Sequence, residues 1–340
     1  MSAAPTSSDM NLERLVRRVV GVMMLGVLVY GGFLVSTGLS DVGSRFASFG
    51  WWSFAAACCL SMLNYLLRFG KWEIYLAILG IRGLPKTESL LTFLSGFVLT
   101  VSPGKVGEVF KSLVLYRTRG VPLERSAPIV VAERVTDLIG VIVMIVVGSL
   151  GFRGGLVWAA AGSGLVLVLL VFVASPKLSR AMVDLTPHLP GPLGRLGARV
   201  APKLHTALDQ LRELTTPSRL VLPTLLSIAG WSLEGVGLWL ILKGFAQSTT
   251  LTLASFSYAT ATLAGAIVPL PGGLGVTDKL IEQQLTHLGG VPLAVAFSAM
   301  VLVRFATLWF AVLVGFVALG LLRARHPRLS SGEPATPSEP

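Results

Sequence analysis

The sequence predicts an all-α polytopic membrane protein with about six full spans and two re-entrant helical hairpins, arranged as two inverted repeats. Three observations support this class. Hydrophobic residues make up 53% of the 340 positions and charged residues only 13%, and the mean hydropathy is +0.75. Several apolar runs reach the length of ~18 or more residues that a membrane helix needs. Two shorter apolar runs end in Pro-Gly breaks, one in each half of the chain.

Six apolar segments are long enough to cross a hydrocarbon core of ~30 Å at ~1.5 Å per residue. They cover residues 19–39, 48–67, 127–150, 155–174, 220–242 and 292–321. The first segment follows Arg14, Arg17 and Arg18 and is longer than the core of a signal peptide. We therefore expect it to be a retained span.

Two further apolar segments are interrupted before they could cross. Residues 89–101 are followed by Ser102-Pro103-Gly104, and residues 251–268 by Pro269-Leu270-Pro271-Gly272-Gly273. A second short helical segment follows each break, at about 106–117 and 276–288. Because proline and glycine end helices, each pair of short limbs predicts a hairpin that enters and leaves the membrane on one side.

The basic residues predict the orientation. The chain has 28 Lys+Arg against 17 Asp+Glu, a net charge of +11. Lysine and arginine are enriched in cytoplasmic loops, and here they cluster before the first span, in the 175–219 loop and after the last span. We therefore expect a protein of the inner cell membrane with both termini in the cytoplasm. This placement explains the charge without a nucleic-acid partner.

The order span, span, hairpin, span occurs twice, and three crossings per copy turn the second copy upside down. The first copy covers residues 13–150, and the second covers residues 151–322 with the cytoplasmic loop 175–219. Polar composition predicts disorder at residues 1–12 and 323–340.

The spacing within the two copies supports a repeat. Both breaks read Pro-Gly-x-x-Gly. Arg134 follows Pro103 by 31 residues, and Arg304 follows Pro271 by 33. Interrupted helices at corresponding positions of two halves indicate a transport site between them.

The first break is a candidate site for an anionic lipid head group, formed by Pro103, Gly104, Lys105, Gly107 and Glu108. The helix that starts there presents free backbone N–H groups and a positive dipole end. The glycines allow close approach to the backbone, and Lys105 adds a positive charge. The alternative is that proline and glycine only kink the hairpin while Lys105 pairs with Glu108.

The second break is uncharged at its tip, with Pro271, Gly272 and Gly273 followed one turn later by Asp278. We expect it to form the opposite wall of the same cavity. The alternative role of Asp278 is to compensate the dipole of the helix that begins there.

Charged residues within the spans are further candidates for binding the substrate. Arg134 and Asp137 are an i, i+3 pair on one helical face, and Glu234 and Arg304 lie in the middle of spans. An ionised group at mid-bilayer costs ~2.5–3.5 kcal/mol, so such residues face an interior and have partners. For Arg304 we expect Asp278, Glu234 or a lipid phosphate. The alternative for Arg134 and Asp137 is a position at the membrane interface. The alternative for Glu234 and Arg304 is a structural buried ion pair.

Other polar features predict no chemistry. Arg68 and Trp72 are interpreted as an anchor at the membrane interface, with a role in binding as the alternative. Residues 204–214 are interpreted as an amphipathic surface helix. Cys58 and Cys59 are neighbours in an apolar span, and the four histidines are scattered. We therefore expect no metal, no cofactor and no catalytic residue.

Together these motifs resemble the lysylphosphatidylglycerol synthase transmembrane-region family, also called flippase-like, which includes the flippase domain of the multiple peptide resistance factor. The resemblance covers about residues 12–322. It is carried by Arg68–Trp72, Pro103–Glu108, Glu133-Arg134-x-x-Asp137 and Pro269–Asp278. Lys105 stands where the family commonly has arginine, and Asp278 where it commonly has glutamate, which changes reach and geometry.

The resemblance implies movement of a lipid between leaflets, with aminoacylated phosphatidylglycerol as the substrate of the best-understood branch. No synthase domain follows residue 322, so we expect a separate lipid-modifying enzyme to make any such lipid. The alternatives are an intramembrane enzyme that uses Glu108, Glu133 or Asp278 as acid or base, and an accessory subunit of a lipid-modifying enzyme.

Overall fold

The computed structural model describes residues 46–102, 108–151, 175–185, 192–268 and 270–326, with single positions at 21, 157, 160, 163 and 164. These residues form helices and turns, and no strand occurs among them. The expected spans 19–39 and 155–174 lie outside the described residues apart from those single positions.

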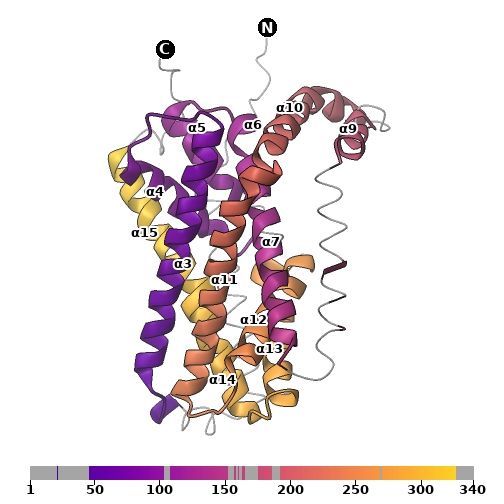
Figure 1. Ribbon diagram of the computed structural model, residues 1–340. Helices are drawn as coiled ribbons and strands as arrows, with labels where there is room; N and C mark the ends of the chain where they lie inside the picture. The colour runs from indigo at the N-terminus through magenta and orange to yellow at the C-terminus, as the bar shows by residue number, and fades with distance from the viewer. Residues whose placement is uncertain are drawn as a thin grey trace.

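Among the described residues, three helices are long and apolar enough to cross a membrane, which confirms a membrane protein. They are α3 (Trp51–Ile78), α11 (Pro217–Gly244) and the continuous run α14 (Leu293–Arg304), η5 (Phe305–Trp309) and α15 (Phe310–Arg325). A fourth long helix, α7 (Pro128–Ser149), runs beside α11 and carries the charged residues of the expected span 127–150 (Figure 1). The predicted end of the second span at residue 67 is wrong, because α3 continues through Arg68 and Lys71 to Ile78.

The second predicted break is present, whereas residues 103–107 of the first break lie outside the described residues. Each interrupted segment contains separate short helices. The first comprises α4 (Lys86–Ser95), η1 (Gly96–Leu99) and α5 (Phe110–Arg119), and the second α12 (Leu251–Ile267), η4 (Pro271–Gly273) and α13 (Val276–His287). Figure 1 shows α4 and α5 at the upper end of the molecule and α12 and α13 in its lower half. The two meet at Val101 and Gly272, since a Cβ on Gly272 would lie 3.7 Å from the Val101 Cα.

Local sequence explains where these elements begin and end. Pro128 and Pro217 occupy the first turns of α7 and α11, where the missing N–H costs no hydrogen bond. The Thr250 hydroxyl accepts a hydrogen bond from the Leu253 N–H and caps α12. Gly120 adopts a left-handed conformation, with φ of 69°, and ends α5.

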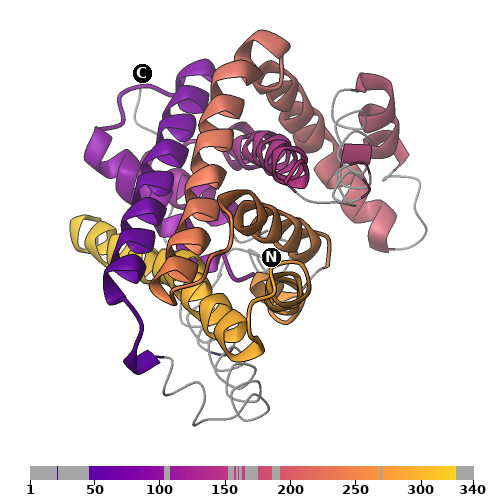
Figure 2. The same ribbon diagram turned by 60° about the horizontal axis from the view of Figure 1, so that its bottom comes forward.

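The centre of the fold is the antiparallel contact between α3 and α11, which lie side by side in Figure 2. Small residues allow the two backbones to approach closely. A Cβ on Gly230 would lie 2.4 Å from the Asn64 Oδ1 atom. At the lower end, the Gly50 N–H donates to the Gly244 carbonyl at 3.0 Å.

Three further helices lie at the upper end of the bundle (Figure 1). They are α6 (Leu123–Ser126), α9 (Pro176–Leu185) and α10 (Pro192–Leu214). The expected loop 175–219 is therefore largely helical, and the predicted helix over 204–214 is the last part of α10. At the C-terminal end, the expectation of disorder from residue 323 is wrong for residues 323–325, which complete α15.

Candidate functional site

A cavity of about 470 Å³ opens among α3, α7, α11, α12 and the α14–α15 run, next to the two breaks. Most of its lining residues are apolar or small, including Leu138, Val141 and Leu308. The charged residues that line it are Arg68, Arg134, Asp137, Glu234 and Arg304. An apolar cavity with a few convergent charged groups is the usual form of a ligand site.

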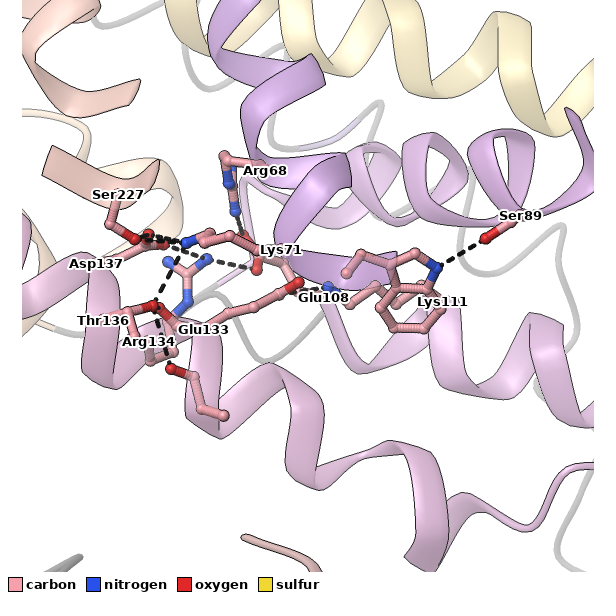
Figure 3. A network of polar contacts seen from close by, with 12 residues as sticks. Arg68, Lys71, Ser89, Glu108, Lys111, Glu133, Arg134, Thr136, Asp137 and Ser227 are labelled. Carbon is pink, nitrogen blue, oxygen red and sulfur yellow. Dashed lines mark hydrogen bonds and ion pairs between the residues drawn. The ribbon is translucent and has the colours of Figure 1, made fainter. Parts of the chain in front are cut away.

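Five residues on one side of the cavity form a continuous chain of ion pairs, which we call the linked cluster: Arg68, Lys71, Glu108, Arg134 and Asp137 (Figure 3). Glu108 lies 2.7 Å from an Arg134 Nη atom and 3.5 Å from an Arg68 Nη atom. Asp137 lies 2.5 Å from the Lys71 Nζ atom and 3.2 Å from the same Arg134 atom. Arg134 thus bridges two acids and has a quarter of its side chain exposed to the cavity.

The rest of this network lies deeper in the protein. Ser227 accepts a hydrogen bond from the Lys71 Nζ atom at 2.7 Å and donates to Asp137 at 2.9 Å. Lys111 pairs with Glu133, and its ammonium lies 4.8 Å from the centre of the Trp72 ring. Such partners offset the cost of removing these charges from water.

The interpretation of Arg68 and Trp72 as an interfacial anchor is wrong. The Trp72 side chain is completely buried, and its indole N–H donates to the Ser89 hydroxyl at 3.1 Å. Arg68 lines the cavity and pairs with Glu108. The physical reason is that α3 continues past these residues, so their side chains face the bundle rather than the interface.

Arg304 holds the second break on the other side of the cavity. Its Nε atom lies 2.9 Å from an Asp278 oxygen, and an Nη group donates to the Gly272 carbonyl. The other Asp278 oxygen accepts a hydrogen bond from the Gly275 N–H at 2.8 Å. Asp278 therefore both caps α13 and pairs with Arg304, so the two roles expected for it coexist.

The backbone at this break requires glycine. Gly272 and Gly273 have φ angles of +60° and +67°, which side-chain-bearing residues rarely adopt. A Cβ on Gly273 would also lie 3.2 Å from the Gly265 Cα. A π-helical turn, η5, begins directly after Arg304, a feature frequent at functional sites.

Glu234 lies in the middle of α11, and its hydrogen-bond partners among the described residues are neutral groups. The Asn64 amide donates to it at 2.6 Å, the Ser61 hydroxyl at 3.3 Å and the Tyr258 hydroxyl at 3.5 Å. Its exposed fraction is 3%, although it lines the cavity.

The structure brings most of the predicted site residues together. Arg134, Asp137, Glu234, Gly272, Gly273 and Arg304 line the cavity. Glu108 and Asp278 lie directly behind them in ion pairs, and Pro271 begins η4. The positions of Pro103, Gly104, Lys105 and Gly107 lie outside the described residues.

Sequence reasoning missed Arg68, Lys71, Asn64 and Tyr258. A signal was available for the first two, because Arg68 and Lys71 are three residues apart and a further apolar stretch follows them to Leu79. That spacing places both charges on one face of a helix that continues. No sequence signal distinguishes Asn64 and Tyr258 from other polar residues in spans.

Long apolar helices around an internal cavity with paired charges define a polytopic helical membrane protein with a polar site in its interior. The family model described as the lysylphosphatidylglycerol synthase TM region matches residues 23–315, and the chain belongs to this family. The resemblance predicted from the sequence motifs is therefore confirmed.

Two relatives are described as UPF0104 membrane proteins. The chain is 30% identical over 126 residues to a UPF0104 membrane protein of Methanothermobacter thermautotrophicus, and this match covers 37% of each chain. It is 23% identical over 230 residues to a UPF0104 membrane protein of Methanocaldococcus jannaschii, covering 65% of this chain and 92% of the relative. The chain thus spans just over a third of the first relative and most of the second.

Proposed function

We propose that the protein moves a lipid with an anionic head group between the two leaflets of its membrane. The observation that carries this proposal is the interior cavity in which the guanidinium groups of Arg68, Arg134 and Arg304 converge. A phosphate crossing a bilayer loses its hydration, and arginine replaces those lost contacts with charge-assisted, often bidentate hydrogen bonds. The apolar lining of the cavity suits the glycerol and acyl portions that accompany the head group.

The inverted repeat is part of this proposal, and corresponding residues support it. Arg134 follows its partner Glu108 by 26 residues, and Arg304 follows its partner Asp278 by 26. Arg68 and Glu234 each stand 17 positions after the first residue of a 28-residue helix, α3 and α11. Two copies of one unit, with hairpins that enter from opposite ends and meet in between, provide a site that opens to either side when the copies rock against each other.

In this proposal, the rocking motion closes the lipid pathway at the contact between the two hairpins. Gly272 approaches Val101 from the first break and Leu308 from η5. In this arrangement the head group exchanges into existing ion pairs, taking the place of Glu108 or Asp278 as a partner for arginine. The acids keep the arginines neutralised between transport events.

An intramembrane enzyme is the alternative function, and the ion pairs of its candidate acids favour it less. Glu108, Glu133 and Asp278, the acids that such an enzyme would use, are each engaged in an ion pair. A general acid or base needs a proton within reach of its substrate, whereas these carboxylates are committed to arginine or lysine.

The test is a lipid-translocation assay with purified protein in liposomes that contain fluorescent phosphatidylglycerol. We expect the parent protein to move the labelled lipid, and Arg304→Ala to move it at the rate of empty liposomes. Arg219→Ala is the control, because Arg219 pairs with Glu213 on the surface, away from the cavity. Equal rates for empty liposomes and the parent protein with several anionic lipids would refute the proposal.

A further inference from the structure

The linked cluster carries an excess of positive charge. It contains three cations, Arg68, Lys71 and Arg134, and two carboxylates, Glu108 and Asp137. On the other side of the cavity, the charges of Arg304 and Asp278 balance each other in a direct ion pair. Among the described residues, the linked cluster therefore has one more cation than it has carboxylates.

Glu234 differs from the acids around it because no described cation is paired with it. Glu108, Asp137 and Asp278 are all ion-paired. Within the described residues, Glu234 forms hydrogen bonds with an amide and two hydroxyl groups and no ion pair. Neutral donors hold a carboxylate less firmly than a cation does, so such a group exchanges its proton more readily than an ion-paired acid.

The ionisation of Glu234 decides the net charge of the described residues around the cavity. Of the described residues that line it or pair with lining residues, four are cations (Arg68, Lys71, Arg134 and Arg304) and four are acids (Glu108, Asp137, Glu234 and Asp278). With Glu234 ionised the set is neutral, and with Glu234 protonated it carries one positive charge. A head group with one negative charge restores neutrality only in the second state, and an unbalanced charge is costly in the membrane interior.

We propose that Glu234 is a proton-binding site, and that the cavity takes up one proton with each singly charged anionic head group. This inference rests on the proposed function and adds its energy source. The Glu234 carboxylate accepts a proton from water in the open cavity when the head group enters, and returns it to water on the opposite side when the head group leaves. The pair crosses the membrane with no net charge.

Other titratable groups face the same space and define the background of any pH response. They are Tyr65 and Arg68 on α3, Arg134 and Asp137 on α7, Tyr258 on α12 and Arg304 on α14. Cys58 on α3 does not line the cavity but interacts electrostatically with Glu234. The arginines keep their charge at all relevant pH values, and Asp137 is held ionised between Lys71 and Arg134. Glu234 is the acid in this set whose proton is free to come and go.

The first test imposes either a pH difference or an electrical potential on liposomes with labelled phosphatidylglycerol. For the parent protein, a pH difference of one unit should shift the ratio of lipid between leaflets by up to about tenfold toward the alkaline side. An electrical potential should have no effect. In Glu234→Gln, which preserves the hydrogen-bond acceptor, the ratio of lipid between leaflets should be independent of pH. It should instead change with the electrical potential, about tenfold per 59 mV for one charge.

Glu282→Gln is the matched control, because Glu282 is a buried glutamate paired with Lys279 outside the cavity. It should behave as the parent does. If the parent ratio followed the potential and ignored pH, the proton site would be refuted while lipid movement stood. If Glu234→Gln lost movement of phosphatidylethanolamine but not of phosphatidylglycerol, Glu234 would be a contact for a head-group ammonium instead, and the inference would also fail.

A binding measurement decides the question independently of lipid movement. Short-chain phosphatidylglycerol is added to detergent-solubilised protein in weakly buffered solution, and proton uptake is recorded together with binding. We expect about one proton for each lipid bound by the parent and none for Glu234→Gln at equal occupancy. Binding without proton uptake by the parent would overturn the inference even where no lipid is moved.

Discussion

The Nε atom of Arg304 lies 2.9 Å from a carboxylate oxygen of Asp278, 26 residues earlier in the chain. Asp278 is completely buried, and the same arginine also holds the Gly272 carbonyl of the break. This pair therefore connects the last membrane helix to the tip of the second interrupted segment. Its removal should have two separable consequences, one for stability and one for lipid movement.

The first prediction concerns stability. Arg304→Ala leaves the Asp278 carboxylate buried without its partner, which typically costs ~3–5 kcal/mol. We expect a clear loss of thermal stability in detergent. In the double variant Arg304→Ala/Asp278→Asn the unpaired charge is absent, so much of the stability should return. A double variant no more stable than Arg304→Ala would show that the ion pair is not the source of the loss.

The second prediction separates charge from geometry in lipid movement. The stabilised double variant should remain inactive in the liposome assay, because the cavity has lost an arginine. Arg304→Lys should keep partial activity if the head group needs only a positive charge, and none if a bidentate contact is required. Normal transport by the stabilised double variant would make Arg304 a purely structural residue.

The third prediction compares the two halves. Arg134→Ala should be less destabilising than Arg304→Ala, because Glu108 retains Arg68 and Asp137 retains Lys71 as partners. Its effect on stability should stay near the ~1 kcal/mol typical of point variants, whereas lipid movement should slow. Thermal unfolding of both variants at matched detergent concentration checks the order. The reverse order would indicate that the linked cluster depends on Arg134 as its bridge.

The breaks and the membrane helices could be predicted because hydropathy and Pro-Gly pairs are local signals. The ends of helices with charged interiors could not. By hydropathy alone, Arg68 and Lys71 predict the end of a span. Both nevertheless belong to α3, because Glu108 and Asp137, which lie 40 and 66 residues later, are their partners. The sequence predicts that Arg304 pairs with Asp278, Glu234 or a lipid phosphate, and only the three-dimensional arrangement selects Asp278.

The same limit applies to Glu234. Its position in the middle of a span indicates an interior residue, but a sequence does not show whether the partner will be a cation or a set of neutral donors. Ser61 and Asn64 lie on α3 and Tyr258 lies on α12, two helices far apart in the chain. The absence of an ion pair within the described residues, which distinguishes Glu234 from its neighbours, is a property of the fold.

The fourth prediction addresses the contact between α3 and α11. In Gly230→Ala the new Cβ would lie 2.4 Å from the Asn64 Oδ1 atom, so the helices must separate or Asn64 must move away from Glu234. We expect a loss of ~1–3 kcal/mol, the usual cost of overpacking. Gly320→Ala is the control, because no atom lies within 4 Å of the Cβ that it adds and alanine favours a helix. A smaller loss for Gly230→Ala than for Gly320→Ala would contradict close packing at this crossing.

The fifth prediction tests the orientation that the basic residues indicate. Val200 belongs to α10 at the upper end of the molecule, and Gln247 follows α11 at its lower end (Figure 1). If the upper end faces the cytoplasm, as the arginine-rich 175–219 segment indicates, these positions lie on opposite sides of the membrane. With Cys58 and Cys59 replaced by serine, a cysteine at Gln247 should react with an impermeant thiol reagent added outside intact cells. A cysteine at Val200 should react only after the membrane is opened. Labelling of Val200 but not Gln247 from outside would invert the topology and, with it, the direction in which each hairpin enters the membrane. Labelling of both positions from outside would contradict a crossing by α11.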